Sequence, residues 1–439
     1  MSSRESHFFT AGIAVTPPFE VRDAPPVLEL SATRAALYRW SFYLTFVSAV
    51  STLFSIAVSQ LSMGLALLAL FASRQRLRFP PLKLPLALFF SATVVALLLS
   101  PDPIGGLPQI RKFFVFSALL LVASTFESIA QIRALVLTWG GVATLSALRG
   151  LWQYSTRRHI AVIDQNANTY DFFLDGRLTG FESHWMTFGG VQMMVLLLLV
   201  SMVLFSDKRR DKVIAWCCLP FLWVCLVLGL TRSVFLLGVP AGVLFLVWSW
   251  RRWAVAAIPI ICLLAFAIAP FQVRDRVISV IQPHGDVDSN SRRTVMRRTG
   301  WAMVRAHPWF GLGPEQIRPQ FDRFVPADIR RPLPRGWYGH LHNIYLQYAA
   351  ERGVPALLFV LWMIVRAAFD FLQAIRRQPT SSEHSFFLYG AVAVIIAALA
   401  EGFFEHNLGD SEVLTLLLNV IACGYVVAQR RVVTGGTCA

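Results

Sequence analysis

The stretch "TFGGVQMMVLLLLVSMVLF" (Thr187–Phe205) carries no charged side chain over a length that crosses the hydrocarbon core of a bilayer as an α-helix. The rest of the chain resembles it. Of 439 residues, 56% are hydrophobic and only 15% are charged, with 34 phenylalanines and 13 tryptophans. One water-facing core could not use so much apolar surface, so the sequence predicts an all-α polytopic membrane protein.

Apolar spans of about 17 to 25 residues recur along the chain and predict about twelve transmembrane helices. The first two run together, with little more than Ser59, Gln60 and Ser62 between them. The predicted spans are residues 40–57, 58–73, 84–100, 112–125, 133–153, 187–205, 213–230, 233–249, 253–270, 353–373, 386–403 and 411–429.

Lysine and arginine gather in one alternating set of short connections, which therefore faces the cytoplasm. Both termini are then inside, and two longer polar segments lie outside. The predicted organisation is a cytoplasmic segment 1–39, nine helices in 40–270 with an outer loop at 154–186, a mainly helical outer loop domain at 271–342, three helices in 343–429 and a cytoplasmic tail 430–439. All six cysteines fall in apolar spans or in the tail, so we expect no disulfide in the outer loops and no cysteine metal site.

The outer segment 271–342 holds twelve arginines and no lysine against six acidic residues. Long loops do not follow the positive-inside rule, so this charge does not contradict the orientation, but such a surface still needs a partner. The planar guanidinium of arginine binds phosphate oxygens in a bidentate way. Within it, "SRRTVMRRTGWAMVRAHPWFGLGPEQ" (Ser291–Gln316) predicts an amphipathic helix of about four turns that ends near Pro308. Arg293 and Arg297 share a face and repel each other, which favours a bound anion. The alternative is an interfacial helix whose arginines contact lipid headgroups.

Arg232 lies in "GLTRSVFLLG", a tight outer turn between two apolar helices. A guanidinium at that depth has to pair with an acidic side chain, with carbonyl groups or with a ligand. The sequence leaves open whether Arg232 faces a ligand or clamps the structure.

The polar stretch "GHLHNIYLQYAAERG" (Gly339–Gly353) adjoins an apolar span, where desolvating polar groups costs free energy unless they are paired or used. His340 and His342 are two residues apart just before a helix. The chain near them lacks the three or four ligands that zinc requires, so no metal is predicted. A neutral imidazole can activate a hydroxyl, and nearby arginines can stabilise a departing pyrophosphate, which together make metal-free glycosyl transfer plausible. The alternative is that the histidines cap and anchor the helix.

Two further outer turns hold polar side chains on the same membrane side. "GRLTGFESHWMTFGG" (Gly176–Gly190) contains Arg177, Glu182 and His184, and "EGFFEHNLGDSE" (Glu401–Glu412) contains Glu405, His406, Asn407 and Asp410. Each turn alone is ordinary loop chemistry. Their predicted convergence makes them candidates for donor or acceptor binding.

Taken in order, the "TRS" turn, the arginine-bearing segment that leads to "HPWFGLGPEQ", and "HLHNIYLQYAAERGVPALL" resemble the O-antigen ligase family, within the O-antigen ligase and polymerase superfamily. The resemblance covers roughly residues 175–410. It implies a GT-C-like helical membrane fold with a periplasmic loop domain in the bacterial inner membrane.

The resemblance also implies a metal-independent, inverting transfer of O-antigen glycan from undecaprenyl pyrophosphate to lipid A-core oligosaccharide, with membrane lipids around it, no cofactor and no nucleic acid. It assigns the catalytic role to His342, with His340 beside it. Pyrophosphate binding falls on Arg232 and Arg293, with Arg292 and Arg297 nearby, although the tryptophan expected four residues after Arg293 is missing. The substrate-binding candidates are Arg177, His184, Asn343, Tyr345 and Asp410.

Three alternatives remain. An O-antigen polymerase differs in its acceptor, and the large number of outer arginines favours a ligase whose acceptor bears phosphates. A protein O-oligosaccharyltransferase is a third enzyme of this class. A transporter would place ionisable groups near the bilayer midplane, whereas here the charges collect at helix ends and outer loops.

Overall fold

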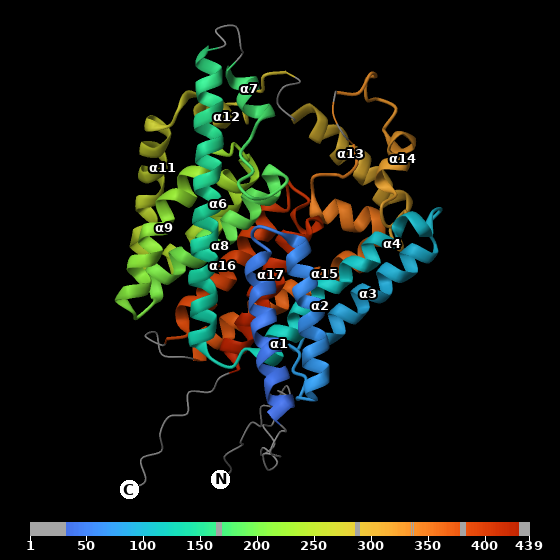
Figure 1. Ribbon diagram of the computed structural model, residues 1–439. Coiled ribbons are helices and arrows are strands. Elements are labelled where there is room, and N and C mark those ends of the chain that lie inside the picture. The colour runs from blue at the N-terminus through green and yellow to red at the C-terminus, as the bar shows by residue number, and fades with distance from the viewer. Residues whose placement is uncertain are drawn as a thin grey trace, which may run out of the picture.

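The computed structural model describes residues 32–163, 169–285, 290–334, 336, 338–377 and 383–429. Helices are the regular structure throughout these ranges, and no β-strand occurs in them (Figure 1). Eight helical segments are long and apolar enough to cross a membrane. The predicted class, an all-α polytopic membrane protein, is confirmed.

Each predicted span overlaps a helix of the structure, several of them broken by short 3₁₀ or π segments. The first half of the chain forms α1 (Ala32–Ser51), α2 (Ile56–Ser73), α3 (Lys83–Leu98), α4 (Pro103–Arg111), η1 (Lys112–Phe116), α5 (Ser117–Thr125), α6 (Ile129–Ile163), α7 (Thr169–Asp175) and α8 (Trp185–Phe205). The second half forms α9 (Arg209–Leu228), η2 (Ser233–Gly238), α10 (Val239–Trp250), η3 (Arg252–Ala256), α11 (Ala257–Ile268), α12 (Phe271–Ile278), α13 (Asn290–Ala306), α14 (Ile317–Phe324), α15 (Ile344–Arg377), α16 (Ser385–Glu401), η4 (Asn407–Gly409) and α17 (Ser411–Ala428).

The expected boundary between the first two spans was wrong. The turn lies at residues 52–55, and Ser59 sits inside α2. Its hydroxyl donates to the carbonyl oxygen of Ser48 on α1 at 2.8 Å, and it lies 2.9 Å from the hydroxyl of Thr52. These small polar residues hold two close helices together instead of separating them, as is common where helices meet in a membrane.

The centre of the bundle is formed by α8, α16 and α17. Their apolar side chains are almost wholly buried, whereas α11 buries none of its residues and exposes Ile260, Leu263 and Leu264. In a membrane the exposed apolar faces of such peripheral helices meet lipid, so they need no protein partner. The buried helices therefore form a fixed support for the loops above them.

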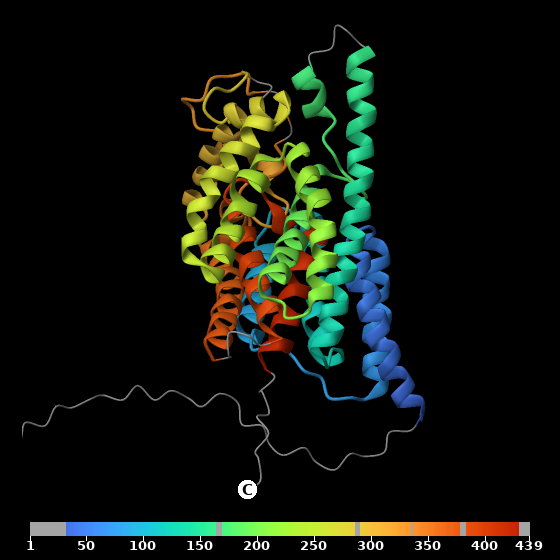
Figure 2. The ribbon, with the colours of Figure 1, turned by 90° about the vertical axis from the view of Figure 1, so that its left-hand side faces the viewer.

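The helices α7, α12, α13 and α14 lie together at one end of the bundle, opposite the end where α1 begins (Figures 1 and 2). We call this the outer end. Connections 74–82, 126–128 and 206–208 lie at the other end (Figure 1). The outer segment contains the helices α12, α13 and α14 with irregular stretches between them, and α13 ends at Ala306, close to the predicted stop near Pro308. It packs on the start of α15, which brings the outer helices over the histidine pair.

Candidate functional site

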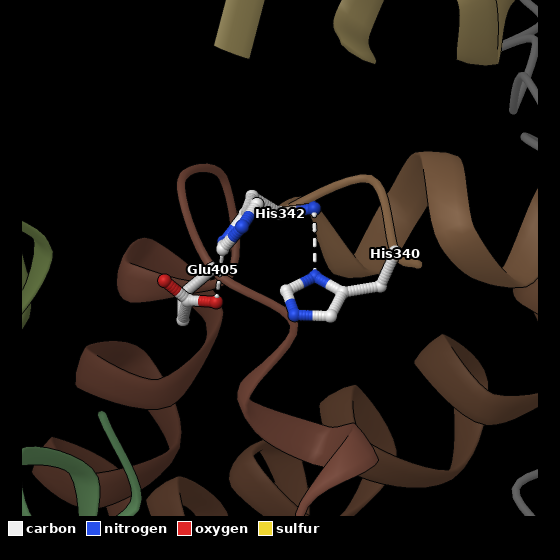
Figure 3. A group of neighbouring side chains, drawn as sticks. All are labelled: His340, His342 and Glu405. Atoms are coloured by element: carbon white, nitrogen blue, oxygen red, sulfur yellow. Dashed lines mark hydrogen bonds and ion pairs between the residues drawn. The ribbon is translucent and has the colours of Figure 1, made fainter. Parts of the chain in front are cut away.

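His342 and Glu405 form a buried pair at the outer end (Figure 3). The Nδ1 atom of His342 lies 2.9 Å from Oε1 of Glu405, and the two side chains are only 8% and 4% exposed. A carboxylate only accepts hydrogen bonds, so Nδ1 carries the proton and Nε2 keeps its lone pair. The pair therefore holds the imidazole in the tautomer that can accept a proton at Nε2.

Backbone and amide hydrogen bonds tie the two loops that carry this pair. Asn343 caps α15, since its Oδ1 accepts from the backbone N–H of Leu346 at 2.9 Å, and its Nδ2 donates to the carbonyl oxygen of Phe403 at 2.9 Å. The backbone N–H of Ile344 donates to the carbonyl oxygen of Gly402, also at 2.9 Å. Asn343, expected to contact substrate, instead fixes His342 against the loop of Glu405.

His340 lies beside His342 but in a different electrostatic state. The ring centroids are 4.0 Å apart, and Nδ1 of His340 accepts from the backbone N–H of His342 at 3.3 Å (Figure 3). The expected shared face arises without an extended chain, because His342 has a φ of 47°. Burial first, and then the adjacent His342, lower the pKa of His340 to about 3. His340 is therefore neutral at neutral pH.

Arg293 on α13 completes the environment of Glu405. Its Nη2 lies 3.4 Å from Oε2 of Glu405, and its side chain is 24% exposed. Burial alone would raise the pKa of Glu405, but the charge and hydrogen bond of His342 and the charge of Arg293 outweigh it and hold that pKa well below its usual range. Glu405 is thus an ionised carboxylate with a cationic or hydrogen-bonding partner on each oxygen.

Two more arginines gather around this carboxylate. Burial first, and then the positive charges of Arg276 and Arg293, lower the pKa of Arg177 to about 9, while Glu405 acts in the opposite direction. The Arg177 guanidinium stacks 4.0 Å from the ring centroid of Trp185. Arg276 is 4% exposed and donates from Nε to the carbonyl oxygen of Leu230 at 3.1 Å. Arg177, Arg276 and Arg293 outnumber the nearby carboxyl groups of Glu405 and Glu401, which makes this region suited to an anion.

Arg232 bridges α12 and α13 in the structure. Its Nη1 donates to the carbonyl and hydroxyl oxygens of Ser279 at 3.2 and 3.1 Å, and its Nη2 donates to Oδ1 of Asn290 at 2.6 Å. Its charge also reaches Arg177. Of the two readings that the sequence left open, these contacts favour the structural clamp.

The other two arginines of the predicted set lie apart. Arg292 packs against Gly336, where an added Cβ would clash with its guanidinium. Arg297 is exposed one turn beyond Arg293, with no described contact to Glu405 or His342. The expectation that Arg293 and Arg297 share one anion site is therefore not supported, because only Arg293 faces the loop of Glu405.

Of the remaining candidates, His184 and Asp410 lie near the site, whereas Tyr345 does not. His184 caps α8 by accepting from the backbone N–H of Met186 at 3.3 Å, and its pKa is lowered by burial, with the charges of Glu405, Arg177 and His342 close enough to act on it. Asp410 accepts from the hydroxyl of Thr187 at 2.7 Å, and burial raises its pKa to about 6. Tyr345 turns away and donates to the carbonyl oxygen of Leu399 on α16 at 2.7 Å.

The sequence analysis missed the role of Glu405, although it placed that residue in the correct outer turn, and it missed Arg276 altogether. Glu405 could have been recognised in the sequence as an acidic side chain in an outer turn next to apolar helices. Arg276 was one of twelve arginines in its segment, and nothing in the local pattern distinguishes it.

The structure also supplies a third potential metal donor that the sequence did not reveal. The ligand atoms of His340, His342 and Glu405 lie within 4.8 Å of one another. However, Oε1 of Glu405 is engaged by His342 and Oε2 by Arg293, and a divalent cation would lie beside that guanidinium. This donor set fits a metal ion poorly, since a hydrated dication needs carboxylate oxygens that are free of positive neighbours.

The "FGLG" and "AAERG" motifs interlock beneath the histidines. The backbone N–H groups of Leu312 and Gly313 donate to the carbonyl oxygens of Ala350 and Glu351 at 2.8 and 2.9 Å. Gly353 breaks α15 with a φ of 84°, and an added Cβ there would clash with the carbonyl oxygen of Trp309. The Gly-x-Gly turn is thus a backbone dock for the start of α15, and its N–H groups are already used.

A relay of side chains connects this dock to His342. Glu351 Oε1 accepts from the backbone N–H of Glu315 at 3.2 Å and from Nε2 of Gln347 at 2.9 Å. Gln347 Oε1 in turn accepts from the backbone N–H of Leu341 at 2.8 Å, next to His342. The outer domain and the histidine pair are therefore one hydrogen-bonded unit.

The fold and site define a polytopic helical membrane protein whose outer end holds a histidine–carboxylate pair surrounded by arginines. Residues 213–361 match the family model described as O-antigen ligase. Over this range, about a third of the chain, the sequence is similar to that family, in agreement with the resemblance. The matched range includes Arg232, Arg293, His340 and His342, while Glu405 lies beyond it. No curated protein matches the chain.

Replacing Gly353 by alanine should destabilise the interlock. Alanine at a φ of 84° is strained, and its Cβ would clash with the Trp309 carbonyl, so we expect a loss of at least about 1–3 kcal/mol in the free energy of unfolding. Thermal unfolding of the purified protein in detergent measures this loss. The matched control is Gly141→Ala on α6, where a Cβ meets no atom within 4 Å and helix propensity favours alanine. Equal melting temperatures for the two variants would contradict the interlock.

Proposed function

We propose that this protein transfers O-antigen glycan from undecaprenyl pyrophosphate to a sugar hydroxyl of lipid A-core oligosaccharide, without a metal ion and with inversion. The single observation that carries the proposal is the 2.9 Å contact between Glu405 and Nδ1 of His342, a residue within the range that matches O-antigen ligases. That family acts in general on lipid-linked glycans. Because a histidine held in this way is a general base for a hydroxyl, the reaction needs no other activating group.

In the proposed step, Nε2 of His342 removes the proton from the acceptor hydroxyl as its oxygen attacks the anomeric carbon of the donor sugar. The bond between that carbon and the pyrophosphate oxygen breaks, and its electron pair leaves with the undecaprenyl pyrophosphate. Glu405 is a positioning residue, which fixes the tautomer of His342 and stabilises the imidazolium that forms. Attack opposite the leaving group gives the inverted anomer.

Arg293 and Arg177 are the proposed contacts for the departing pyrophosphate, with Arg276 behind them. All three influence one another electrostatically around Glu405, and arginine donates to phosphate oxygens as a planar fork. Arg232 contributes by holding α12 to α13, which carries Arg293. His184 and Asp410 are retained as candidates for acceptor binding.

The proposed setting is the bacterial inner membrane with the outer end in the periplasm. In this proposal, the helix α1 and the shorter helices α3, α11 and α16 cross the membrane together with the eight long apolar segments. This gives the twelve predicted spans and places both termini in the cytoplasm. The basic connections at the end opposite α12–α14 support this orientation. A GT-C-like arrangement, with the loop domain over the site, is part of the same proposal.

His342→Ala should lower glycan transfer by about 10²- to 10⁴-fold, the usual contribution of a general base. Product formed by the purified variant is compared with wild type at matched insertion and melting temperature. The control is His307→Ala, because His307 is exposed on the same outer segment and contacts Phe324 instead of the site. Transfer by His342→Ala at the rate of the control would remove the general-base role.

Arg293→Ala should weaken transfer strongly, whereas Arg297→Ala, one turn along the same helix, should leave it near the wild-type rate. Arg293→Lys should recover only part of the loss, since lysine cannot form the bidentate fork. The measurement is the initial rate as a function of donor concentration. Equal losses for the Arg293 and Arg297 alanine variants would instead favour a diffuse charge effect.

The proposed function itself is tested with purified protein and undecaprenyl-pyrophosphate-linked glycan, offered with lipid A-core or with no second acceptor, and with EDTA throughout. We expect product only with lipid A-core, and no effect of EDTA. Longer lipid-linked glycan without that acceptor would make the protein a polymerase. Loss of transfer in EDTA that is restored by a divalent cation would show that His340, His342 and Glu405 hold a metal ion after all.

A further inference from the structure

The loop of residues 402–410 has a second side, which the proposed reaction does not use. Glu405 faces His342, but the next residue, His406, lines a separate cavity together with Lys112, Tyr348 and Arg352. Lys112 crosses this cavity, and its Nζ donates to the carbonyl oxygen of Gly409 at 3.0 Å. One short loop therefore connects the histidine pair with a cationic cavity behind it.

Arg352 is a buried cation in this cavity, with its side chain 5% exposed. It donates from Nη2 to Oε1 of Gln109 at 2.7 Å, and its guanidinium lies 4.8 Å from the ring centroid of Tyr348. Its Nε is buried and has no hydrogen-bond partner among the described residues. Desolvating an unsatisfied donor costs free energy, so an oxygen atom brought to this position would be stabilised.

His406 gives a second, independent indication. Its Nδ1 is buried and likewise lacks a partner within the described part of the chain. Burial first, and then the nearby His340, Lys112 and Arg352, hold the pKa of His406 well below its ordinary value. The described side chains that line the cavity include no acidic group. Arg352 has an acidic neighbour outside this lining, since its Nη2 lies 3.9 Å from Oε2 of Glu351. Lys112 and Arg352 together outnumber that carboxylate, so the cavity is electropositive and offers donors to an anion.

An apolar groove of about 320 Å³ adjoins the cavity on the membrane-facing surface of α3 and η1. Phe113 and Phe116 line both spaces, so the groove and the cationic cavity are immediate neighbours. Leu86, Ala87 and Phe90 form its opposite wall. A hydrocarbon chain can lie in this groove while a charged head group reaches Lys112.

We propose that the groove and the cavity together bind one anionic phospholipid, with a chain against Phe90 and Phe113 and its phosphate against Lys112 and Arg352. Charge complementarity supports an anionic head group over a neutral one. The cavity lies beside the reaction centre, because the ring of His406 in its lining is 5.9 Å from the ring of His340. A membrane phospholipid is the proposed occupant because an apolar groove and a cavity with two cations lie next to each other.

Binding there would act on the loop through Lys112. The cavity has free space of about 20 Å³, enough for one water-sized group, so a phosphate enters only when Lys112 leaves the Gly409 carbonyl oxygen. The lipid therefore exchanges the bond between Lys112 and Gly409 for one between Lys112 and phosphate. Because Gly409 and Glu405 share one loop, the position of Glu405 responds to the lipid.

The test is native mass spectrometry of the full-length protein with phosphatidylglycerol or phosphatidylcholine added. We expect one tightly retained phosphatidylglycerol, and about tenfold weaker retention in Lys112→Gln, which loses one charge-assisted contact. Arg111→Gln is the matched control, since Arg111 is the exposed neighbour of Lys112. Ala87→Trp should fill the groove and also weaken retention, whereas Leu84→Trp, exposed on the same helix outside the groove, should not.

Several results would overturn the proposal. Equal retention by Lys112→Gln and Arg111→Gln, or equal retention of both phospholipids, would remove the recognition of charge. Saturation by inorganic phosphate alone would make this a soluble anion site, and preferred retention of undecaprenyl phosphate would make it part of the substrate path. The binding readout needs no transfer activity, so failure of the proposed function and failure of this lipid site are separate outcomes.

Discussion

The carboxylate of Glu405 is the charge on which the arrangement of the outer end depends. It is buried close to several arginines, and each of its oxygens has a partner: the imidazole of His342 on Oε1 and the guanidinium of Arg293 on Oε2. Replacing it by a neutral group would leave Arg293 and Arg177 close together with little to offset their repulsion, and removal of one partner from a buried pair destabilises strongly. The same carboxylate selects the tautomer of His342. Stability of the outer end and reactivity of the imidazole thus rest on one side chain.

The loop that carries Glu405 is held from two directions. On one side it accepts hydrogen bonds from Ile344 and Asn343 at the start of α15, and on the other from Lys112 beside η1. Below it lie α16 and α17, whose apolar side chains are almost wholly buried. A loop fixed in this way can hold an ionised carboxylate in one position. Lys112 is a half-buried side chain, so its hydrogen bond is the contact to this loop that can change.

Most of the fold could be predicted from the sequence, because transmembrane helices follow from long apolar spans such as Thr187–Phe205. The boundary near Ser59 could not, since a serine that bonds to a neighbouring helix looks the same in sequence as one in a turn. At the site, His340, His342, Arg177 and Arg293 were predicted and lie together. The pairing of His342 with Glu405 joins residues 63 apart in the chain, and no local pattern encodes it. Asn343 and Tyr345 were predicted to bind substrate because both are polar residues at a membrane edge. Polar residues in such a place either bind substrate or form hydrogen bonds within the protein, and these two form hydrogen bonds within the protein.

The cations near Glu405 show why a buried charge cluster favours arginine over lysine. Burial and neighbouring cations lower the pKa of Arg177 to about 9, and the guanidinium still stays protonated at neutral pH. A lysine at the same place would begin from a pKa of about 10.4 and, lowered by the same amount, would titrate close to neutrality. It would then lose much of the charge that a phosphate needs. Cations held close together and largely out of water, as Arg177, Arg276 and Arg293 are, therefore require the arginine side chain.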